Sequence, residues 1–212
     1  MANISDTVYR ICDDLTRQSS DIGPVVQREI LSACEFYAGQ RLGFNERVLS
    51  FTLSQTQTYS LDTIATANSL ASVLAVDDVR YTVSSRYIVL DPVPMAEWRR
   101  LDTTSSETGP PDFFAVFNKS LYVYTTPDAS YDATMACHVK LLSLDGEVVT
   151  SNGWLEEGLE LITARATRMT LAKKLDDFEK AQVYAGIEGE CFARLLEQRS
   201  LLMETGRLVP HD

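Results

Sequence analysis

The spacing of apolar residues changes twice along this chain of 212 residues, and these changes constrain the fold more than any other feature. Apolar side chains recur every three or four positions over residues 4–42 and again over residues 154–203, which is the period of an α-helix. Between these segments the period falls to two, as in β-strands. This order predicts an α+β protein, in which N- and C-terminal helices form a helical bundle and an antiparallel or mixed β domain is inserted between them.

Two helices are expected at the start of the chain. Residues 4–18 place one face of a helix at Ile4, Val8, Ile11 and Leu15. A second helix is expected over residues 22–42, with Asp21 as its N-cap and Pro24 in its first turn. Its apolar stripe consists of Val26, Ile30, Ala33 and Tyr37. The polar residues 18–21 separate the two helices, so we expect an antiparallel pair.

Several short runs in the centre of the chain read as strands. They lie at residues 48–53, 57–61, 69–83 and 86–90. A short helix over residues 95–101 is expected to be anchored by Trp98. The runs 112–117 and 120–125 flank Asn118-Lys119 and predict a β-hairpin.

Residues 133–144 form the clearest half-buried strand, because alternate positions are apolar. The apolar set is Ala133, Met135, Cys137, Val139 and Leu141. His138 falls on the other face, where we expect a solvated or hydrogen-bonded side chain.

Helical periodicity returns after the β region. Two helices are expected, over residues 154–173 and 176–203, and the stripe of the second runs from Phe178 to Leu202. The domain organisation that follows is a helical domain of residues 1–45 and 150–204, a β-rich domain of residues 46–149, and a C-terminal tail of residues 205–212.

The composition excludes several classes of function. The formal net charge of −11 disfavours tight binding of nucleic acid, which needs clustered Lys and Arg. No apolar run reaches the roughly 18–20 residues that span a bilayer, and the first residues lack the features of a secretory signal, so no membrane association is expected. The four cysteines are far apart, which predicts buried free thiols rather than a zinc site.

No catalytic set is visible in the sequence. The chain contains two histidines and none of the common nucleophile, nucleotide-binding or metalloprotease motifs. Asp77-Asp78 is expected to mark a turn or bulge in a strand. The alternative is a small enzyme with a dispersed acidic site there, holding a divalent metal. We therefore expect no catalytic residues, no metal site, no cofactor and no enzymatic activity.

Two further segments suggest contacts with partners. Arg99-Arg100 beside Trp98 favours salt bridges to a neighbouring subunit, with nucleic-acid contact as the alternative. The tail after residue 204 carries two adjacent aliphatic residues, an Arg and a Pro. It is either a frayed end or a segment that becomes ordered in a groove of a partner.

The order of these elements resembles the head-to-tail adaptor proteins of short-tailed, podovirus-type bacteriophages, which sit between the portal ring and the tail nozzle. The resemblance covers most of the chain. It is carried by the N-terminal helix pair, by the closing helix pair with Thr163-Ala164-Arg165-Ala166, and by a β stretch containing Phe51-Thr52-Leu53, Tyr59-Ser60-Leu61, Gly109-Pro110-Pro111-Asp112-Phe113-Phe114 and Leu121-Tyr122-Val123-Tyr124-Thr125-Thr126-Pro127.

The resemblance implies a virion structural protein, assembled in the host cytoplasm as a ring of twelve copies through which DNA passes without sequence-specific binding. It implies a C-terminal extension that binds the portal protein, which here corresponds to Gly206, Arg207, Leu208, Val209, Pro210, His211 and Asp212. The candidates for contact with the tail nozzle protein are Thr103, Thr104, Ser105, Ser106 and Glu107. The alternative is a tail-completion or tail-tube subunit that does not contact the portal.

Overall fold

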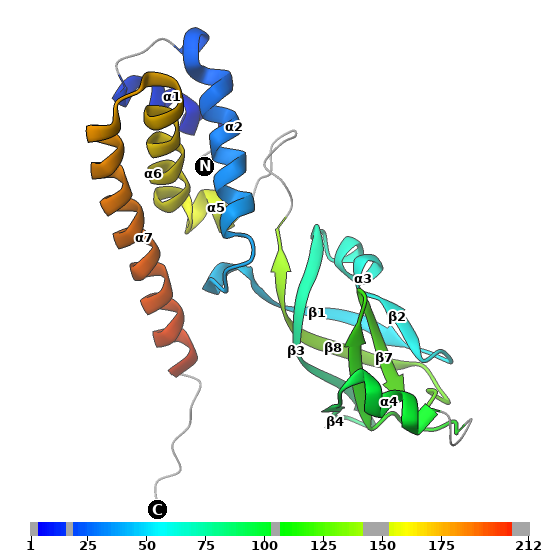
Figure 1. Cartoon of the computed structure of the whole chain (residues 1–212). Helices are drawn as coiled ribbons and strands as arrows, with labels where there is room; N and C mark the ends of the chain where they lie inside the picture. Colours follow the sequence, from blue (N-terminus) through cyan, green and yellow to red (C-terminus); the bar gives the residue numbers. More distant parts are fainter. Residues whose placement is uncertain (1–3, 16–18, 103–106, 142–152, 205–212) are drawn as a thin grey trace, which may run out of the picture. The chain divides into compact units, whose positions relative to one another are not determined.

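The computed structural model describes residues 4–15, 19–102, 107–141 and 153–204 (Figure 1). The chain divides into two compact units, which we name the helical unit (residues 1–45 and 143–212) and the β unit (residues 46–142). The described residues contain seven α-helices and two four-stranded sheets. The predicted α+β fold, with helices at both ends of the chain and a β region between them, is confirmed.

The helical unit begins with α1 (Ile4–Asp14) and α2 (Ser19–Tyr37). The predicted apolar stripe of α2 is confirmed, because its four residues are all buried: Val26, Ile30, Ala33 and Tyr37. The predicted start of α2 is wrong: the helix begins at Ser19, so Asp21 lies in its first turn and is not the N-cap. Ser and Asp are favoured at the N-terminal end of a helix. The polar residues 19–21 therefore form the first turn of α2 and not a link before it.

The C-terminal part of the helical unit comprises α5 (Gly153–Glu156), α6 (Leu159–Thr170), the π-helix η2 (Leu171–Leu175) and α7 (Phe178–Glu204). The expected single helix over residues 154–173 is therefore interrupted. The interruption lies at Gly158, where an added Cβ would be 2.9 Å from the ring of Trp154 and 3.1 Å from the ring of Phe44. The two rings meet edge to face with centroids 4.9 Å apart, so packing at this corner requires glycine.

α7 starts two residues later than expected, after Asp176 adopts a left-handed backbone with φ 53°. Asp177 then caps the helix by accepting a hydrogen bond from the backbone N–H of Lys180 at 3.1 Å. The expected place of Phe178 in the buried stripe is wrong, because its side chain is 66% exposed. The buried residues of α7 are Ala181, Glu188, Cys191 and Leu195, of which Ala181, Cys191 and Leu195 belong to the expected stripe.

α6 is the central helix of the helical unit and lies between α2 and α7 (Figure 1). Its position explains its composition, because a helix covered on two sides needs small or apolar residues around most of its surface. The buried residues of α6 are Leu161, Ile162, Ala164, Ala166, Thr167 and Thr170.

The first sheet of the β unit is antiparallel and has the order β1-β8-β3-β4. Its strands are β1 (Glu46–Leu53), β8 (Tyr131–Lys140), β3 (Ser72–Val83) and β4 (Arg86–Val89). The pairing of β3 with β8 shifts register between Val76 and Asp78, so the predicted irregularity at Asp77-Asp78 is a β-bulge.

The second sheet has the order β2-β7-β6-β5 and is mixed, because β5 runs parallel to β6. Its strands are β2 (Thr58–Ser60), β7 (Ser120–Tyr124), β6 (Phe113–Phe117) and β5 (Asp91–Pro92). β6 and β7 form the predicted hairpin, and both Asn118 and Lys119 have positive φ (46° and 59°), as a two-residue turn demands.

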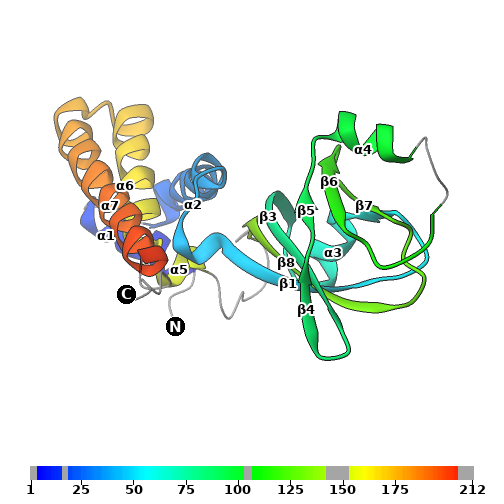
Figure 2. The same cartoon turned by 90° about the horizontal axis from the view of Figure 1, so that it is seen from below.

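Two short helices complete the β unit. α4 (Met95–Asp102) confirms the predicted helix; it packs on β6 and β7 (Figure 2), with buried Trp98 5.1 Å from the ring of Tyr122. α3 (Leu61–Ala67) was not expected. Its N-cap Ser60 accepts a hydrogen bond from the N–H of Thr63 at 3.3 Å.

The core of the β unit lies between the two sheets and contains apolar residues from both. Alternation along β8 is confirmed, because Ala133, Met135, Cys137 and Val139 are all buried. His138, on the opposite face, is 3% exposed, so of the two expected environments the solvated one is wrong. β8 is a central strand, and His138 lies between Glu46 of β1 and Ala75 of β3.

Candidate functional site

The residues predicted to contact partners lie mostly where the structure is not described. Gly206, Arg207, Leu208, Val209, Pro210, His211 and Asp212 are outside the described residues, as are Thr103, Thr104, Ser105 and Ser106. Glu107 is described and exposed. It lies beside the end of β7, where its carbonyl oxygen accepts a hydrogen bond from the N–H of Thr126 at 3.1 Å.

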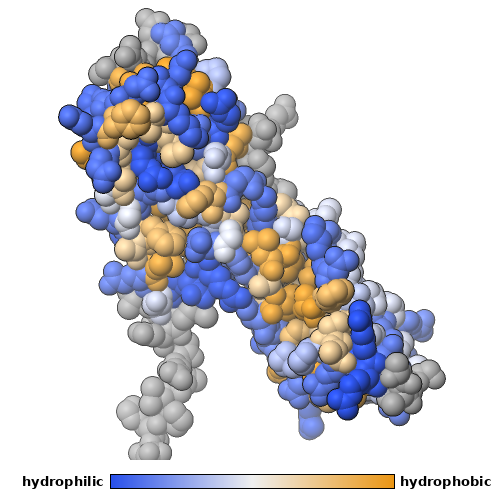
Figure 3. Space-filling model, in the orientation of Figure 1, coloured by the Kyte–Doolittle hydropathy of each residue, from blue (hydrophilic) through white to orange (hydrophobic). Residues whose placement is uncertain are grey.

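Large apolar side chains are exposed on three helices of the helical unit. They belong to α1, α2 and α7 and are Tyr9, Phe36, Phe178, Val183, Ile187 and Leu196. The hydropathy surface shows apolar residues in separate groups over both units (Figure 3). The exposed apolar residues of the helical unit thus come from three different helices.

The described residues of the helical unit line two pockets. One, of about 290 Å³, lies between α1, α6 and α7, and we name it the α1–α6–α7 groove; its lining residues are Thr7, Arg10, Asp14, Leu159, Glu160, Thr163, Ala164, Tyr184, Ile187 and Cys191. The other, of about 310 Å³, lies between α1 and α2 and has no charged lining residue. Tyr9 lines the second pocket.

The β unit also exposes apolar residues on its first sheet. The register pairs Val48 with Ala136 and Val89 with Arg80, which places these residues on the face opposite Leu49 and Met135 of the core. Val48 and Val89 are 59% and 58% exposed, and Leu74 and Tyr87 are exposed as well.

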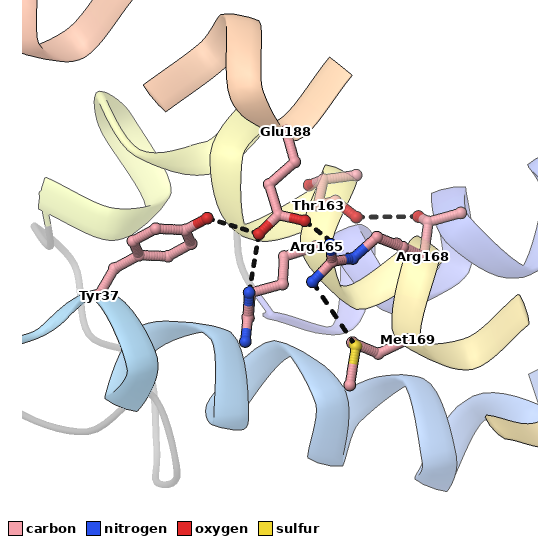
Figure 4. A network of polar contacts seen from close by, with 7 residues as sticks. Tyr37, Thr163, Arg165, Arg168, Met169 and Glu188 are labelled. Atoms are coloured by element: carbon pink, nitrogen blue, oxygen red, sulfur yellow. Dashed lines mark hydrogen bonds and ion pairs between the residues drawn. The ribbon is translucent and has the colours of Figure 1, made fainter. Parts of the chain in front are cut away.

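A buried carboxylate ties three helices of the helical unit together (Figure 4). Glu188 of α7 is 5% exposed. Its Oε1 accepts a hydrogen bond from the hydroxyl of Tyr37 on α2 at 2.5 Å and one from Nη1 of Arg165 on α6 at 2.8 Å. Its Oε2 pairs with Nε of Arg168 at 2.9 Å. With two hydrogen-bond donors and a second guanidinium around it, this carboxylate holds the bundle together and is poorly suited to act as a general base.

Aromatic rings enclose this network. The guanidinium of Arg165 lies over the ring of Phe36 at 3.4 Å, and Tyr37 stacks on Phe192 with centroids 5.4 Å apart. Burial and the hydrogen bond to Glu188 raise the pKa of Tyr37 to about 12. Tyr37 therefore remains a hydrogen-bond donor at neutral pH.

A second ion pair joins α2 to η2, the π-helix that follows α6. Glu29, 3% exposed, accepts hydrogen bonds from Nζ of Lys173 at 3.0 and 3.3 Å. Like the Glu188 network, this pair connects residues far apart in the sequence and fixes the packing of neighbouring helices.

The cysteines are not suited to nucleophilic catalysis. All four are free, as predicted, and Cys12, Cys137 and Cys191 are buried, whereas the predicted burial of Cys34 is only partial. Burial raises the pKa of Cys34 to about 12 and that of Cys137 to about 11, which disfavours the thiolate. Within the part of the chain that the structure describes, no three His, Cys, Asp or Glu side chains are grouped as metal ligands. The described helices include none that is both long and apolar enough to span a bilayer.

Glu188 is the important residue that sequence reasoning missed. The sequence did contain a signal for it. Glu188 lies seven residues after Ala181 and seven residues before Leu195, both of which are apolar and buried. A charged residue on an apolar stripe needs partners. Its partner Tyr37 is 151 positions away and could not be identified by spacing.

Comparison of the chain with models of known protein families finds no match, and comparison with curated protein sequences finds none at a significant level.

Proposed function

We propose that this protein is a non-enzymatic adaptor of a bacteriophage virion, which forms a ring between the portal protein and the tail nozzle protein and encloses part of the DNA ejection channel. The observation that carries the proposal is the exposure of large apolar side chains on separate helices of the helical unit, among them Phe36, Phe178 and Val183. A closed ring needs two different surfaces on every copy, because the contacts between neighbours are heterologous.

Two properties of the chain support this proposal. The buried network at Glu188 locks α2, α6 and α7 into one rigid element, which suits a component of a mechanical assembly. The net charge of −11 gives a surface that repels phosphate, so DNA can pass a ring of such subunits without adhering to it.

The contacts with the flanking proteins follow from the resemblance described above. Residues 206–212 are the proposed portal-binding segment, and residues 103–107 are the proposed contact with the tail nozzle. The proposed ring has twelve copies, formed mainly by the helical units.

Mixing the purified chain with the portal ring of the same virus tests the proposal. We expect mass photometry and negative-stain images to show an additional ring on portal particles. Removal of residues 205–212 is expected to weaken this attachment while the circular dichroism spectrum stays unchanged. Portal particles without added density would contradict the adaptor function, and rings formed only on tail components would favour a tail-completion or tail-tube subunit.

A further inference from the structure

The α1–α6–α7 groove combines an apolar floor with an acidic rim. Leu159, Ala164 and Ile187 contribute aliphatic groups to its lining, and Ile187 is 41% exposed. Val183 lies one helical turn from Ile187 on α7 and is 63% exposed. Burying these side chains against a partner would be favourable, since apolar surface gains free energy when it leaves water.

The size of the groove suits side chains of a partner. Its volume is about 290 Å³. A cavity of about 150 Å³ lined by aliphatic residues is enough to hold benzene. The groove therefore has room for one or two large apolar side chains.

Carboxylates outnumber cations around the groove. Asp14 and Glu160 line it, and further exposed carboxylates flank it on α1 and α7: Asp6, Asp13 and Glu190. Arg10 also lines the groove, and Arg194 is paired with Glu160. The rim therefore keeps an excess of negative charge.

α7 also carries two glycines on its exposed side, outside the lining of the groove. Gly186 lies between Val183 and Glu190 on the exposed side of α7, and a Cβ added to Gly186 or to Gly189 would meet no atom within 4 Å. Glycine is unfavourable inside a helix compared with alanine, and packing within this chain does not require it at either position. Both glycines leave the backbone of α7 open to a neighbouring chain.

We propose that the α1–α6–α7 groove binds a basic amphipathic segment of another protein, with apolar side chains on the groove floor and Lys or Arg against the carboxylates of the rim. Charge complementarity at the groove argues for a partner of this kind, because the carboxylates of the rim attract Lys and Arg and repel an acidic segment. The inference goes beyond the adaptor function, because it specifies the chemistry of the bound segment. It holds for any protein that carries a segment of this kind.

Three synthetic peptides of equal length test the inference with the full chain. The first has leucine at every third or fourth position and lysine elsewhere, as in an amphipathic helix. The second replaces lysine by glutamate, and the third replaces leucine by serine. We expect the leucine–lysine peptide to bind at least about tenfold more tightly than either of the others in fluorescence anisotropy. Its affinity should fall as salt is added, because the rim contacts are electrostatic.

Variants locate the binding site. Ile187→Ser on the floor, and the pair Asp14→Asn and Glu190→Gln on the rim, should each weaken binding of the leucine–lysine peptide by about tenfold. Phe117→Ser is the matched control for the floor, because Phe117 of the β unit is 50% exposed. Asp91→Asn with Glu97→Gln is the matched control for the rim, and both controls should bind the peptide as the wild type does.

Several results would overturn the inference. Equal affinity for the leucine–lysine and leucine–glutamate peptides would show that charge does not contribute to binding. Unchanged binding by Ile187→Ser would show that the peptide does not bind in the groove. If Ile187→Ser instead abolished self-association of the chain in mass photometry, the occupant would be a second copy. Attachment to portal particles is a separate measurement, so failure of the groove and failure of the adaptor function remain distinguishable.

Discussion

At the scale of single residues, Glu188 has the greatest influence on the helical unit. It is buried, and it accepts hydrogen bonds or ion pairs from Tyr37, Arg165 and Arg168. A buried ion pair adds little compared with apolar packing, but loss of one partner leaves the other charges without compensation.

Glu188→Ala is therefore expected to lower the free energy of unfolding by about 3–5 kcal/mol. Urea unfolding followed by circular dichroism at 222 nm measures this change. Glu190→Gln is the control, because Glu190 is exposed on the same helix and should change the stability by less than about 0.5 kcal/mol. Equal effects of the two substitutions would show that the network contributes nothing specific.

The glycines of the helical unit give a second prediction at this scale. Gly158→Ala should lower the free energy of unfolding by about 1–3 kcal/mol, because the new methyl group would press on the rings of Trp154 and Phe44. Gly186→Ala is the matched control and should raise it by up to about 1 kcal/mol, since a methyl group there meets nothing and alanine favours the helix. Thermal unfolding of both variants shows whether each substitution lowers or raises the stability. Stabilisation by Gly158→Ala would contradict the packing described.

At the scale of elements, contacts between helices decide how the N- and C-terminal segments combine. Tyr37 connects α2 to α7, and its environment makes this connection sensitive to alkaline pH. The pKa of Tyr37 is raised from 10.0 to about 12 in the folded protein, so the folded state binds the phenolic proton more tightly than the unfolded state. The stabilisation is complete below pH 10 and is lost as the pH rises towards 12.

Tyr37→Phe removes this titration. We expect the wild type to lose stability between pH 10 and pH 12 more steeply than the variant, because only the wild type must release the Tyr37 proton to unfold there. The difference between their urea midpoints across this pH range isolates Tyr37 from the other tyrosines. Parallel pH profiles would mean that Tyr37 has an ordinary pKa in the folded protein.

At the scale of the whole molecule, each unit has its own core. The buried cluster of the β unit is formed entirely by residues within 46–142, from Leu49 to Val139. A segment that contains its whole hydrophobic core can fold by itself.

We therefore expect residues 46–142, expressed alone, to fold cooperatively and to give a dispersed amide spectrum in NMR. Met135 is fully buried in the central strand β8, so Met135→Asp in the same fragment should abolish the dispersion. A collapsed spectrum of the unchanged fragment would show that the β unit depends on the helical unit for its stability.

Much of the secondary structure could be predicted from the sequence because it depends on local rules. The stripe of α2, the turn at Asn118-Lys119 and the alternation along β8 follow from residues close together in the chain. α3 was missed, although Ser60 before Leu61 and Asp62 is an N-terminal helix signal, because seven residues are too few to establish a helical period.

The candidate site could be predicted much less well. Phe178 was placed incorrectly by periodicity, because burial depends on which neighbour covers each face of a helix. Asp21 was placed incorrectly as the N-cap, because the polar residues before it are also compatible with the first turn. The α1–α6–α7 groove brings together residues from three helices at the two ends of the chain, and no local pattern marks it.

The sequence by itself determined the α+β class and the nature of most elements, because hydrophobic period and turn residues act over a few positions. Only the tertiary structure decided the strand order β1-β8-β3-β4, the break at Gly158 and the pairing of Glu188 with Tyr37. It also decided which apolar residues, such as Val183 and Ile187, remain exposed for a partner. The physical reason is that these features depend on contacts between distant segments, whose geometry is settled only when the whole chain packs.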